Sequence, residues 1–412
     1  MNFPVERGPG LASGLRALPH ALNGKTVSAA FVAFLFSITG PAMMYIETAG
    51  KLGLTDAQAS AWLFGCYAVG GLLGICCALY YGMPITGAAC IPGATMLAAA
   101  LQGAAYEEII GVFVFSGLLV LLIGLSGLTD RLMRLIPLPI VMGMVSGCMI
   151  QYGVNIVANV TASPLLCAAA VFGYLLTPRL GRKLPAMLGA LVFSVAALTV
   201  FGGFSAPEGE TALVTPVLCA PRWNGAYFLS AAVPLAILVV GAQNAQAIGV
   251  LKAEGYEPPV NGMTVLSGLA SMTAGLVGAH NASIAGPMTA ICAAEETGAR
   301  DTRYAASVLS GVLCILFGVF AGYVIGFSRC IPAGLVSTLA GLGMIGVLIN
   351  ALKGSFCAGH FTTGAFAAFV TGMSGLSIFG IGGAFWGLVF GCFVSLLTER
   401  EDFASMRGGT RS

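Results

Sequence analysis

Long apolar runs, separated by short polar stretches, follow one another from about residue 27 to about residue 397. A run of roughly 20 apolar residues is long enough to cross the hydrocarbon core of a bilayer as a helix. The pattern therefore predicts an all-α polytopic membrane protein with fourteen transmembrane segments. The expected segments are residues 27–46, 59–81, 93–103, 108–128, 135–155, 163–177, 185–203, 228–250, 262–278, 285–296, 304–327, 333–351, 360–375 and 378–397.

The two halves of this pattern resemble each other. Residues 116–137 and 310–332 carry the same landmarks in the same order: a Ser-Gly pair, two further glycines and an Arg-x-Ile-Pro motif. An odd number of spans per half inverts the second half relative to the first, so we expect two inverted seven-segment repeats. Residues 27–203 form the first repeat, residues 228–398 the second, and residues 204–227 an external connector.

The basic residues predict an orientation. If residues 1–26 are cytoplasmic, only Lys51, Arg222 and Arg329 of the 18 Lys and Arg fall on the outer side. Short cytoplasmic loops of membrane proteins are enriched in Lys and Arg. We therefore expect the N-terminal segment and the tail, residues 399–412, to lie in the cytoplasm.

Composition excludes several classes of function. The chain is 58% hydrophobic and 8% charged, whereas soluble domains carry about 25% charged residues. A net charge of +2 without a concentrated basic patch gives no sign of nucleic-acid binding. The 12 cysteines lie mostly within apolar runs without the spacing of metal ligands, so we expect small buried side chains, no metal and no cofactor. Nothing resembles a removable signal peptide.

Two segments are too interrupted by Pro and Gly to begin a continuous helix, namely residues 84–93 and 278–287. Each is interpreted as a short extended segment that leads into a half-helix beginning near Gly93 or Gly286, with two kinked helices as the alternative. Extended backbone at membrane depth is tolerated only inside protein or beside a wet cavity. The N-termini of two inverted half-helices would meet near the midplane, where their N–H groups favour an anion.

Polar side chains near these breaks are the candidate binding residues. Gln243 and Asn244 stand in an otherwise apolar span and either contact a ligand or hold helices together. His280 either carries a coupling proton or is a neutral structural side chain. The full set of expected site residues is Gly93, Ala94, Gln243, Asn244, His280, Asn281, Ser283, Ser37 and Thr39.

Acidic residues are informative because none of the 16 Asp and Glu falls deep within an expected span. Glu47 is nearest, at the outer end of the first span. A proton-coupled carrier often uses a buried carboxylate, so we expect the substrate, if it is a carboxylic acid, to bring the proton itself.

These motifs resemble the benzoate/proton symporter (BenE) family over residues 27–397. The resemblance is carried by Gln243-Asn244-Ala245, by residues 380–387 (Gly-Ile-Gly-Gly-Ala-Phe-Trp-Gly), and by residues 91–94, 111–113, 131–137, 255–256 and 289–292. It implies an architecture similar to uracil permeases, with a core domain (residues 27–128 plus 228–327) that moves against a gate domain (residues 135–203 plus 333–397).

By this resemblance, the chain would be a homodimer in the lipid of a bacterial inner membrane and would take up an aromatic carboxylate such as benzoate with a proton. It departs from the family at His280-Asn281 and at Gln246, where a proline is usual, so the substrate could differ from benzoate. Gln243 stands where uracil permeases carry an acidic residue, which disfavours nucleobases. A nucleobase or other small-anion transporter and an anion channel stay open as alternatives. A membrane-embedded enzyme is disfavoured, because no nucleophile–base pair, metal cluster or phosphate loop is visible.

Overall fold

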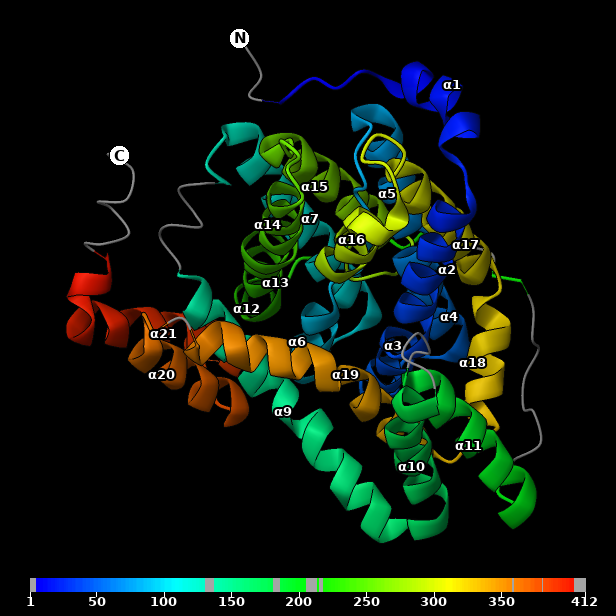
Figure 1. Ribbon diagram of the computed structural model, residues 1–412. Coiled ribbons are helices and arrows are strands. Elements are labelled where there is room, and N and C mark those ends of the chain that lie inside the picture. The colour runs from blue at the N-terminus through cyan, green and yellow to red at the C-terminus, as the bar shows by residue number, and fades with distance from the viewer. Residues whose placement is uncertain are drawn as a thin grey trace.

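The computed structural model describes residues 5–129, 137–180, 186–204, 213–214, 218–357, 359–379 and 381–403, and nearly all of these ranges are helical (Figure 1). The helices of the first half are α1 (Leu11–Ala21), α2 (Gly24–Thr39), α3 (Pro41–Lys51), α4 (Asp56–Phe64), α5 (Gly70–Tyr81), α6 (Ile91–Ala100), α7 (Tyr106–Ser126), α9 (Leu138–Ala162), α10 (Pro164–Leu180) and α11 (Ala186–Phe201). Those of the second half are α12 (Gly225–Tyr227), α13 (Val233–Leu238), α14 (Ala245–Ala253), α15 (Val260–Leu276), α16 (Gly286–Ala293), α17 (Tyr304–Val319), α18 (Ala321–Arg329), α19 (Ala333–Phe356), α20 (Thr362–Met373) and α21 (Gly383–Thr398).

Short irregular turns join some of these helices into longer rods. Turns η1 (Gly65–Val69), η2 (Phe228–Ala232) and η3 (Val239–Asn244) have the wider π-helical winding, and η4 (Glu295–Thr297) is a single 3₁₀ turn. The wider winding adds a residue to the turn and is frequent at functional sites. Turn η3 contains Gln243 and Asn244, two of the candidate binding residues.

Each of the expected apolar segments overlaps one helix or several helices and turns that follow one another directly. By length and composition, six of the described helical stretches can cross a membrane, or seven if the bent pair α17 and α18 counts as one span. The helices α6, α10, α11 and α21 are apolar but shorter. The protein is therefore a predominantly helical, multi-pass membrane protein, while the number of crossings stays a prediction.

The structure breaks two segments that the pattern presents as continuous. The first span divides at Gly40, because Pro41 begins a new helix and has no N–H for the preceding one. The eleventh bends by 57° between α17 and α18. The N-terminal segment also contains an unpredicted helix, α1, which packs on α5; Gly14 is in contact with the backbone of Leu79, where no side chain would fit.

The two interrupted segments fold as the Pro and Gly pattern predicts. Strand β1 (Gly87–Ala88) pairs antiparallel with strand β2 (Ser283–Ile284), and Gly87 lies opposite Ile284. Helices α6 and α16 follow the two strands directly. A second antiparallel pair, β3 (Ser377–Ile378) and β4 (Ile381–Gly382), precedes α21.

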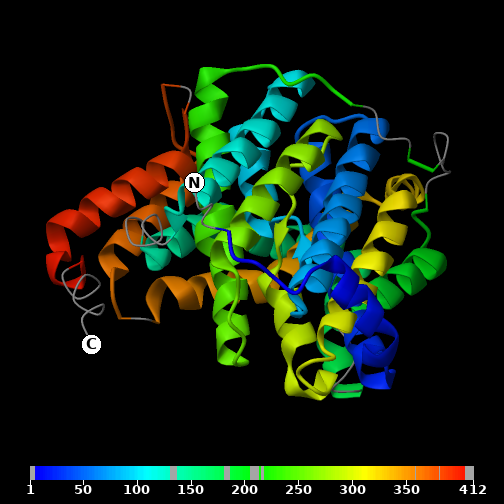
Figure 2. The same ribbon diagram turned by 90° about the horizontal axis from the view of Figure 1, so that it is seen from above.

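The helices pack in two groups. Helix α7 lies along α15 and α5 along α17, whereas α9 lies along α19 and α20, and α10 along α11. Figure 1 shows the second group below the first, and both views place α20 and α21 at the edge opposite α18 (Figures 1 and 2). The groups meet where α3 packs on α19 and α6 on α9.

Some of the basic residues, motif residues and connecting residues on which the predictions rest lie outside the described part of the chain. These are Arg131, Arg134, Arg182 and Lys183, most of the connector between residues 205 and 217, Gly380, and the tail beyond residue 403.

Candidate functional site

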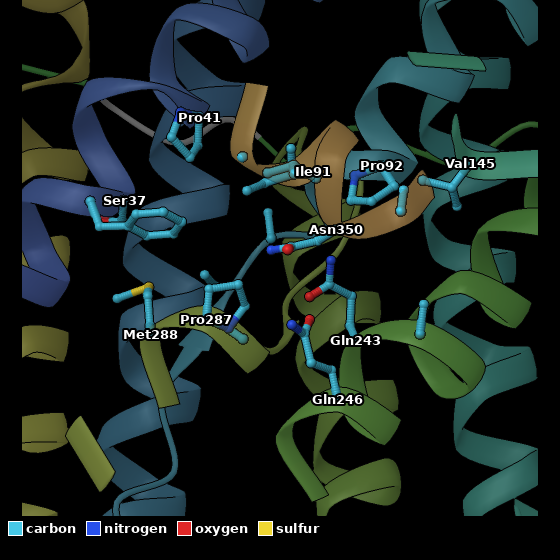
Figure 3. A pocket seen from close by; sticks show the side chains of 18 of the residues that line it. Ser37, Pro41, Ile91, Pro92, Val145, Gln243, Gln246, Pro287, Met288 and Asn350 are labelled. Atoms are coloured by element: carbon cyan, nitrogen blue, oxygen red, sulfur yellow. The ribbon is translucent and has the colours of Figure 1, made fainter. Parts of the chain in front are cut away.

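A cavity of about 360 Å³ lies between the two groups of helices (Figure 3). The strand–helix breaks form one wall, and α9 and α19 form the opposite wall. Its lining residues are Phe36, Ser37, Pro41, Tyr45, Cys66, Tyr67, Ala88, Ala89, Ile91, Pro92, Leu138, Met142, Val145, Ala242, Gln243, Ala245, Gln246, Ala285, Pro287, Met288, Gly343, Gly346, Val347, Asn350, Ala351 and Gly354. This volume is near the lower end of the roughly 300–1,000 Å³ that small-molecule pockets occupy.

Both half-helices present their first turn to this cavity. Pro92 and Pro287 are each the second residue of their helix, so the two breaks repeat the same local design. The N–H groups of a first helical turn have no intrahelical partner, and proline removes one of them. Ile91 and Met288, which line the cavity, therefore carry the backbone N–H groups that the two helix starts can offer to a ligand.

Helix α6 begins two residues before the expected start at Gly93. The reason is Cys90, whose thiol caps the helix by accepting from Gly93 N–H at 3.3 Å, while its carbonyl accepts from Ala94 N–H at 3.1 Å. Cys90 thus satisfies the N–H groups of both Gly93 and Ala94, and the cavity meets Ile91 and Pro92 instead.

Three of the expected site residues bind the backbone of the breaks. Asn281 Oδ1 accepts from Cys90 N–H at 2.9 Å, and Asn244 Oδ1 accepts from Ile284 N–H at 3.3 Å. The Ser283 hydroxyl donates to Ala88 C=O at 3.3 Å. Asn281, Asn244 and Ser283 are almost completely buried and do not line the cavity. Because a buried backbone group without a partner is costly, these side chains stabilise the extended segments.

His280 is also enclosed in this framework. The Trp62 indole N–H donates to His280 Nδ1 at 2.9 Å, so Nδ1 must be an acceptor. Nε2 then carries the proton and donates to Cys90 C=O, also at 2.9 Å. This arrangement fixes a neutral ring, since a second proton on Nδ1 would face another donor. In this conformation the geometry favours the structural interpretation of His280 over proton transfer.

The polar end of the cavity is formed by three amides. The side chains of Gln243 and Gln246 extend from the α13–α14 rod toward Asn350 of α19 (Figure 3). Gln246 also covers the start of α16, because its side chain lies against Gly286, where a Cβ would collide with it. Amide N–H groups and helix N-termini together make this end of the cavity attractive to a carboxylate or another small anion.

The first span contributes less polarity than expected. Ser37 lines the cavity, but its hydroxyl donates to Phe34 C=O at 2.8 Å. Thr39 donates to Leu35 C=O at 2.8 Å and does not line the cavity. Both hydroxyls thus bond back to their own helix, as Ser and Thr in helices often do.

Aromatic and apolar side chains line most of the remaining wall, and sequence reasoning missed most of them. The hydroxyl of Tyr45 donates to Ala89 C=O and that of Tyr67 to Ser37 C=O, so the two rings remain as apolar surface. Tyr45 and Tyr67 lie edge to face with centroids 6.2 Å apart. Among the described residues, no Asp, Glu, Lys, Arg or His lines the cavity. Selectivity for an anion would therefore come from dipoles rather than from a full positive charge.

A multi-pass helical protein with a cavity between two half-helix starts has the architecture of a membrane transporter. Comparison with known proteins identifies the family of transporters to which the chain belongs. Residues 21–397 match the BenE family, which is described as benzoate membrane transport protein. The chain belongs to this family of transporters, as its motifs predict, and not to a family of enzymes.

Two curated relatives cover almost the whole chain. Inner membrane protein YdcO of Escherichia coli is 30% identical over 92% of this chain and 98% of its own length. The benzoate membrane transport protein of Acinetobacter baylyi is 25% identical over 92% of this chain and 96% of its own.

Solved structures share the fold. The transmembrane domain of the cyanobacterial bicarbonate transporter BicA has a TM-score of 0.62 at 16% identity, and the match covers 93% of this chain and 97% of that one. The murine anion transporter Slc26a9, in its inward-facing state, has a TM-score of 0.62 at 12% identity, covering 94% of this chain and 70% of that one.

Proposed function

We propose that the protein is a secondary transporter that takes up benzoate or a related aromatic or organic carboxylate together with a proton. The observation that carries this proposal is the cavity with one polar end, formed by three amides and two half-helix starts, and an otherwise mainly apolar wall. A carboxylate matches the polar end, and a single aromatic ring matches the Tyr45 and Tyr67 surface.

The proposed mechanism is alternating access. The core domain (residues 27–128 plus 228–327) moves against the gate domain (residues 135–203 plus 333–397), and the substrate stays between them. This division agrees with the two packing groups, since α9 and α19 face the half-helices across the cavity. The proposal includes fourteen spans in two inverted repeats, cytoplasmic termini, an inner-membrane location and a homodimer.

The described cavity wall contains no charged residue that could carry the proton in proton-coupled transport. A carboxylic acid that enters with its own proton needs no titratable side chain beside it. The same wall disfavours a nucleobase carrier, because the acidic residue that such a carrier would place at Gln243 is replaced by an amide.

Transport by the full chain in proteoliposomes tests the proposal. Labelled benzoate should accumulate when the outside is made acidic, and unlabelled benzoate inside should drive saturable counterflow without any gradient. Equal uptake with and without the pH gradient would refute proton coupling, and entry without counterflow would indicate a channel.

Substrate class is tested separately by thermal shift of the purified protein. Benzoate, substituted benzoates, small aliphatic acids and uracil are compared between about pH 5.5 and about pH 8. Stabilisation by the aromatic acids is expected, because they match both the apolar and the polar end of the cavity. Stabilisation by uracil alone would replace the proposed substrate with a nucleobase.

A further inference from the structure

The N-terminal helix α1 carries a row of leucines that the described protein leaves exposed. Leu11, Leu15 and Leu22 are 46%, 55% and 42% exposed. Their spacing of four and seven residues places them on one side of a helix. We call these three residues the leucine edge. Large apolar side chains gathered on one side of a surface helix mark a place where a protein or a membrane binds.

Helix α1 has three different sides. Gly14 and Ala21 are buried against the protein, and the leucine edge lies about 90° around the helix from them. Ser13, Arg16 and His20 are exposed and form a third side, which lies roughly opposite the leucine edge. A helix with an apolar side opposite a polar side is suited to lie along a bilayer surface. The contact with the protein falls between these two sides and leaves both of them accessible.

Helix α1 comes directly before the first membrane segment. Only Leu22 and Asn23 separate it from α2, and the Asn23 side chain caps the first turn of α2. The stretch Gly24–Lys51 is long and apolar enough to cross a membrane. Val27 and Phe31, one helical turn apart on α2, are 45% and 52% exposed, as expected of a face in contact with lipid. The leucine edge therefore lies where the chain enters the bilayer, and both views place α1 at the periphery of the molecule (Figures 1 and 2).

The N-terminal segment is fixed to the protein, so the fold itself sets the direction of the leucine edge. Helix α1 packs on α5 and α17, and the Tyr304 hydroxyl donates to Gly14 C=O at 2.9 Å. The Glu6 carboxylate caps the start of α15 by accepting from Gly262 N–H at 2.9 Å. An 11-residue helix is marginal by itself, and these contacts hold only one of its sides. Helices α5, α15 and α17 all belong to the proposed core domain.

The charges of the segment favour an anionic surface. Arg7 and Arg16 are exposed, and neither forms an ion pair with a described residue. Glu6 is the only acidic residue between residues 5 and 31, and its two oxygens already accept from backbone N–H groups. Basic residues beside an apolar helix side are attracted to anionic lipid headgroups.

We propose that the leucine edge of α1 binds the anionic lipid surface of the bilayer and ties the core domain to one leaflet. The leucines enter the boundary between headgroups and acyl chains, Arg16 reaches the headgroup phosphates, and Ser13 faces water. In the proposed orientation this is the cytoplasmic leaflet, whose surface is negatively charged. The proposal requires no particular substrate and no proton coupling.

Quenching of tryptophan fluorescence by brominated lipid tests the depth of α1. The full chain is reconstituted in vesicles of phosphatidylglycerol and a phosphatidylcholine with brominated acyl chains. Leu15→Trp adds a tryptophan on the leucine edge, and Ser13→Trp, the matched control, adds one on the opposite side. The signal of the parent chain, from Trp62, Trp223 and Trp386, is subtracted. Leu15→Trp should lose most of its added fluorescence, whereas Ser13→Trp should keep it.

Both positions are exposed, so neither substitution requires the protein to repack. If Leu15→Trp does not fold, Leu11→Trp places the probe on the same edge. The two leaflets of the vesicles have the same lipids, so the result does not depend on the orientation of the chain.

Hydrogen–deuterium exchange tests the preference for anionic lipid. A peptide covering residues 11–22 is followed in the full chain, in nanodiscs of phosphatidylglycerol or of phosphatidylcholine alone. One basic residue at an anionic surface favours binding by about fivefold, so exchange should be at least about fivefold slower in phosphatidylglycerol. Arg16→Gln should reduce this difference, whereas Leu15→Ser should speed exchange in both lipids.

The outcomes separate the bilayer from other occupants of the leucine edge. Absence of quenching in Leu15→Trp, or equal quenching in Ser13→Trp, overturns the proposal. Unquenched but blue-shifted emission of Leu15→Trp would assign the edge to a second copy of the chain instead. Equal exchange in the two lipids overturns the assignment to an anionic surface. None of these results bears on benzoate transport, so this proposal and the proposed function can fail independently.

Discussion

The two helix groups approach each other backbone to backbone beside the cavity, between Gly40 and Gly343. A Cβ built on Gly40 would lie 2.8 Å from Gly343 Cα, and one built on Gly343 would approach Gly40 even more closely. Carbon atoms normally stay about 3.5–4 Å apart. Alanine at Gly343 therefore requires α19 and the start of α3 to separate by roughly 1 Å.

Overpacking of this kind costs about 1–3 kcal/mol. If α3 separates from α19 during transport, Gly343→Ala destabilises only the state in which they touch. The equilibrium then moves toward the other state by about 5- to 150-fold. Counterflow, which requires both states, should slow because the touching state has become rare.

Gly346 provides the matched control. It lies on the same helix and lines the same cavity, yet a Cβ there would meet no atom within 4 Å. Gly346→Ala should retain wild-type backbone exchange around α3, whereas Gly343→Ala should increase it. If both variants match wild type in exchange and in counterflow, the close approach is not part of the populated state and the domain-movement mechanism loses its main structural support.

Four other outcomes can be tested, two at the site and two at cysteines outside it. Gln243→Ala should weaken binding of the carboxylate by about 1–3 kcal/mol in a thermal-shift titration, because an amide donor is lost at the polar end; undiminished affinity would remove the residue from the site. His280→Gln should lower the melting temperature, since the Trp62 indole loses its acceptor, but the pH profile of transport should stay unchanged if the ring is neutral throughout. Orientation is testable with a membrane-impermeant maleimide: the exposed Cys357 should react in inside-out vesicles and not in intact cells. Burial, with a smaller effect of the Glu107 carboxylate, raises the pKa of the Cys219 thiol, so its labelling from outside should be slow at neutral pH and faster as the pH rises.

Sequence reasoning located the breaks because Pro and Gly act locally. Proline and glycine around Pro92 and Pro287 exclude a continuous helix regardless of tertiary contacts. A helix break at membrane depth must be buried in protein or line a cavity. The pairing of β1 with β2 was not predictable, since it joins residues almost 200 positions apart. Helix α1 was missed because it is short, ends in a polar segment and packs on α5 only in the folded protein.

The candidate site was predictable in part. The Gln243 side chain lines the cavity, as expected for an amide in an otherwise apolar span. Asn350 is also an amide in an apolar segment, but it falls at the end of the expected span 333–351, where a polar residue needs no special explanation. The sequence does not indicate that Tyr45, Met142 and the other apolar lining residues face a cavity. Their side chains are equally suited to packing in the core, to contact with lipid and to contact with a ligand.

The helix breaks also explain why so many of the residues expected to bind a ligand form hydrogen bonds to the protein backbone instead. A broken helix leaves N–H and C=O groups unpaired at a depth where water is scarce, and those groups must be satisfied before any ligand is bound. Asn281, Asn244 and His280 serve this purpose, each with a carbonyl or N–H of the opposite or neighbouring segment. Polar residues within a break are therefore better assigned to its backbone. Those on the helices that face it, such as Gln243 and Asn350, line the cavity and are the candidates for contact with a ligand.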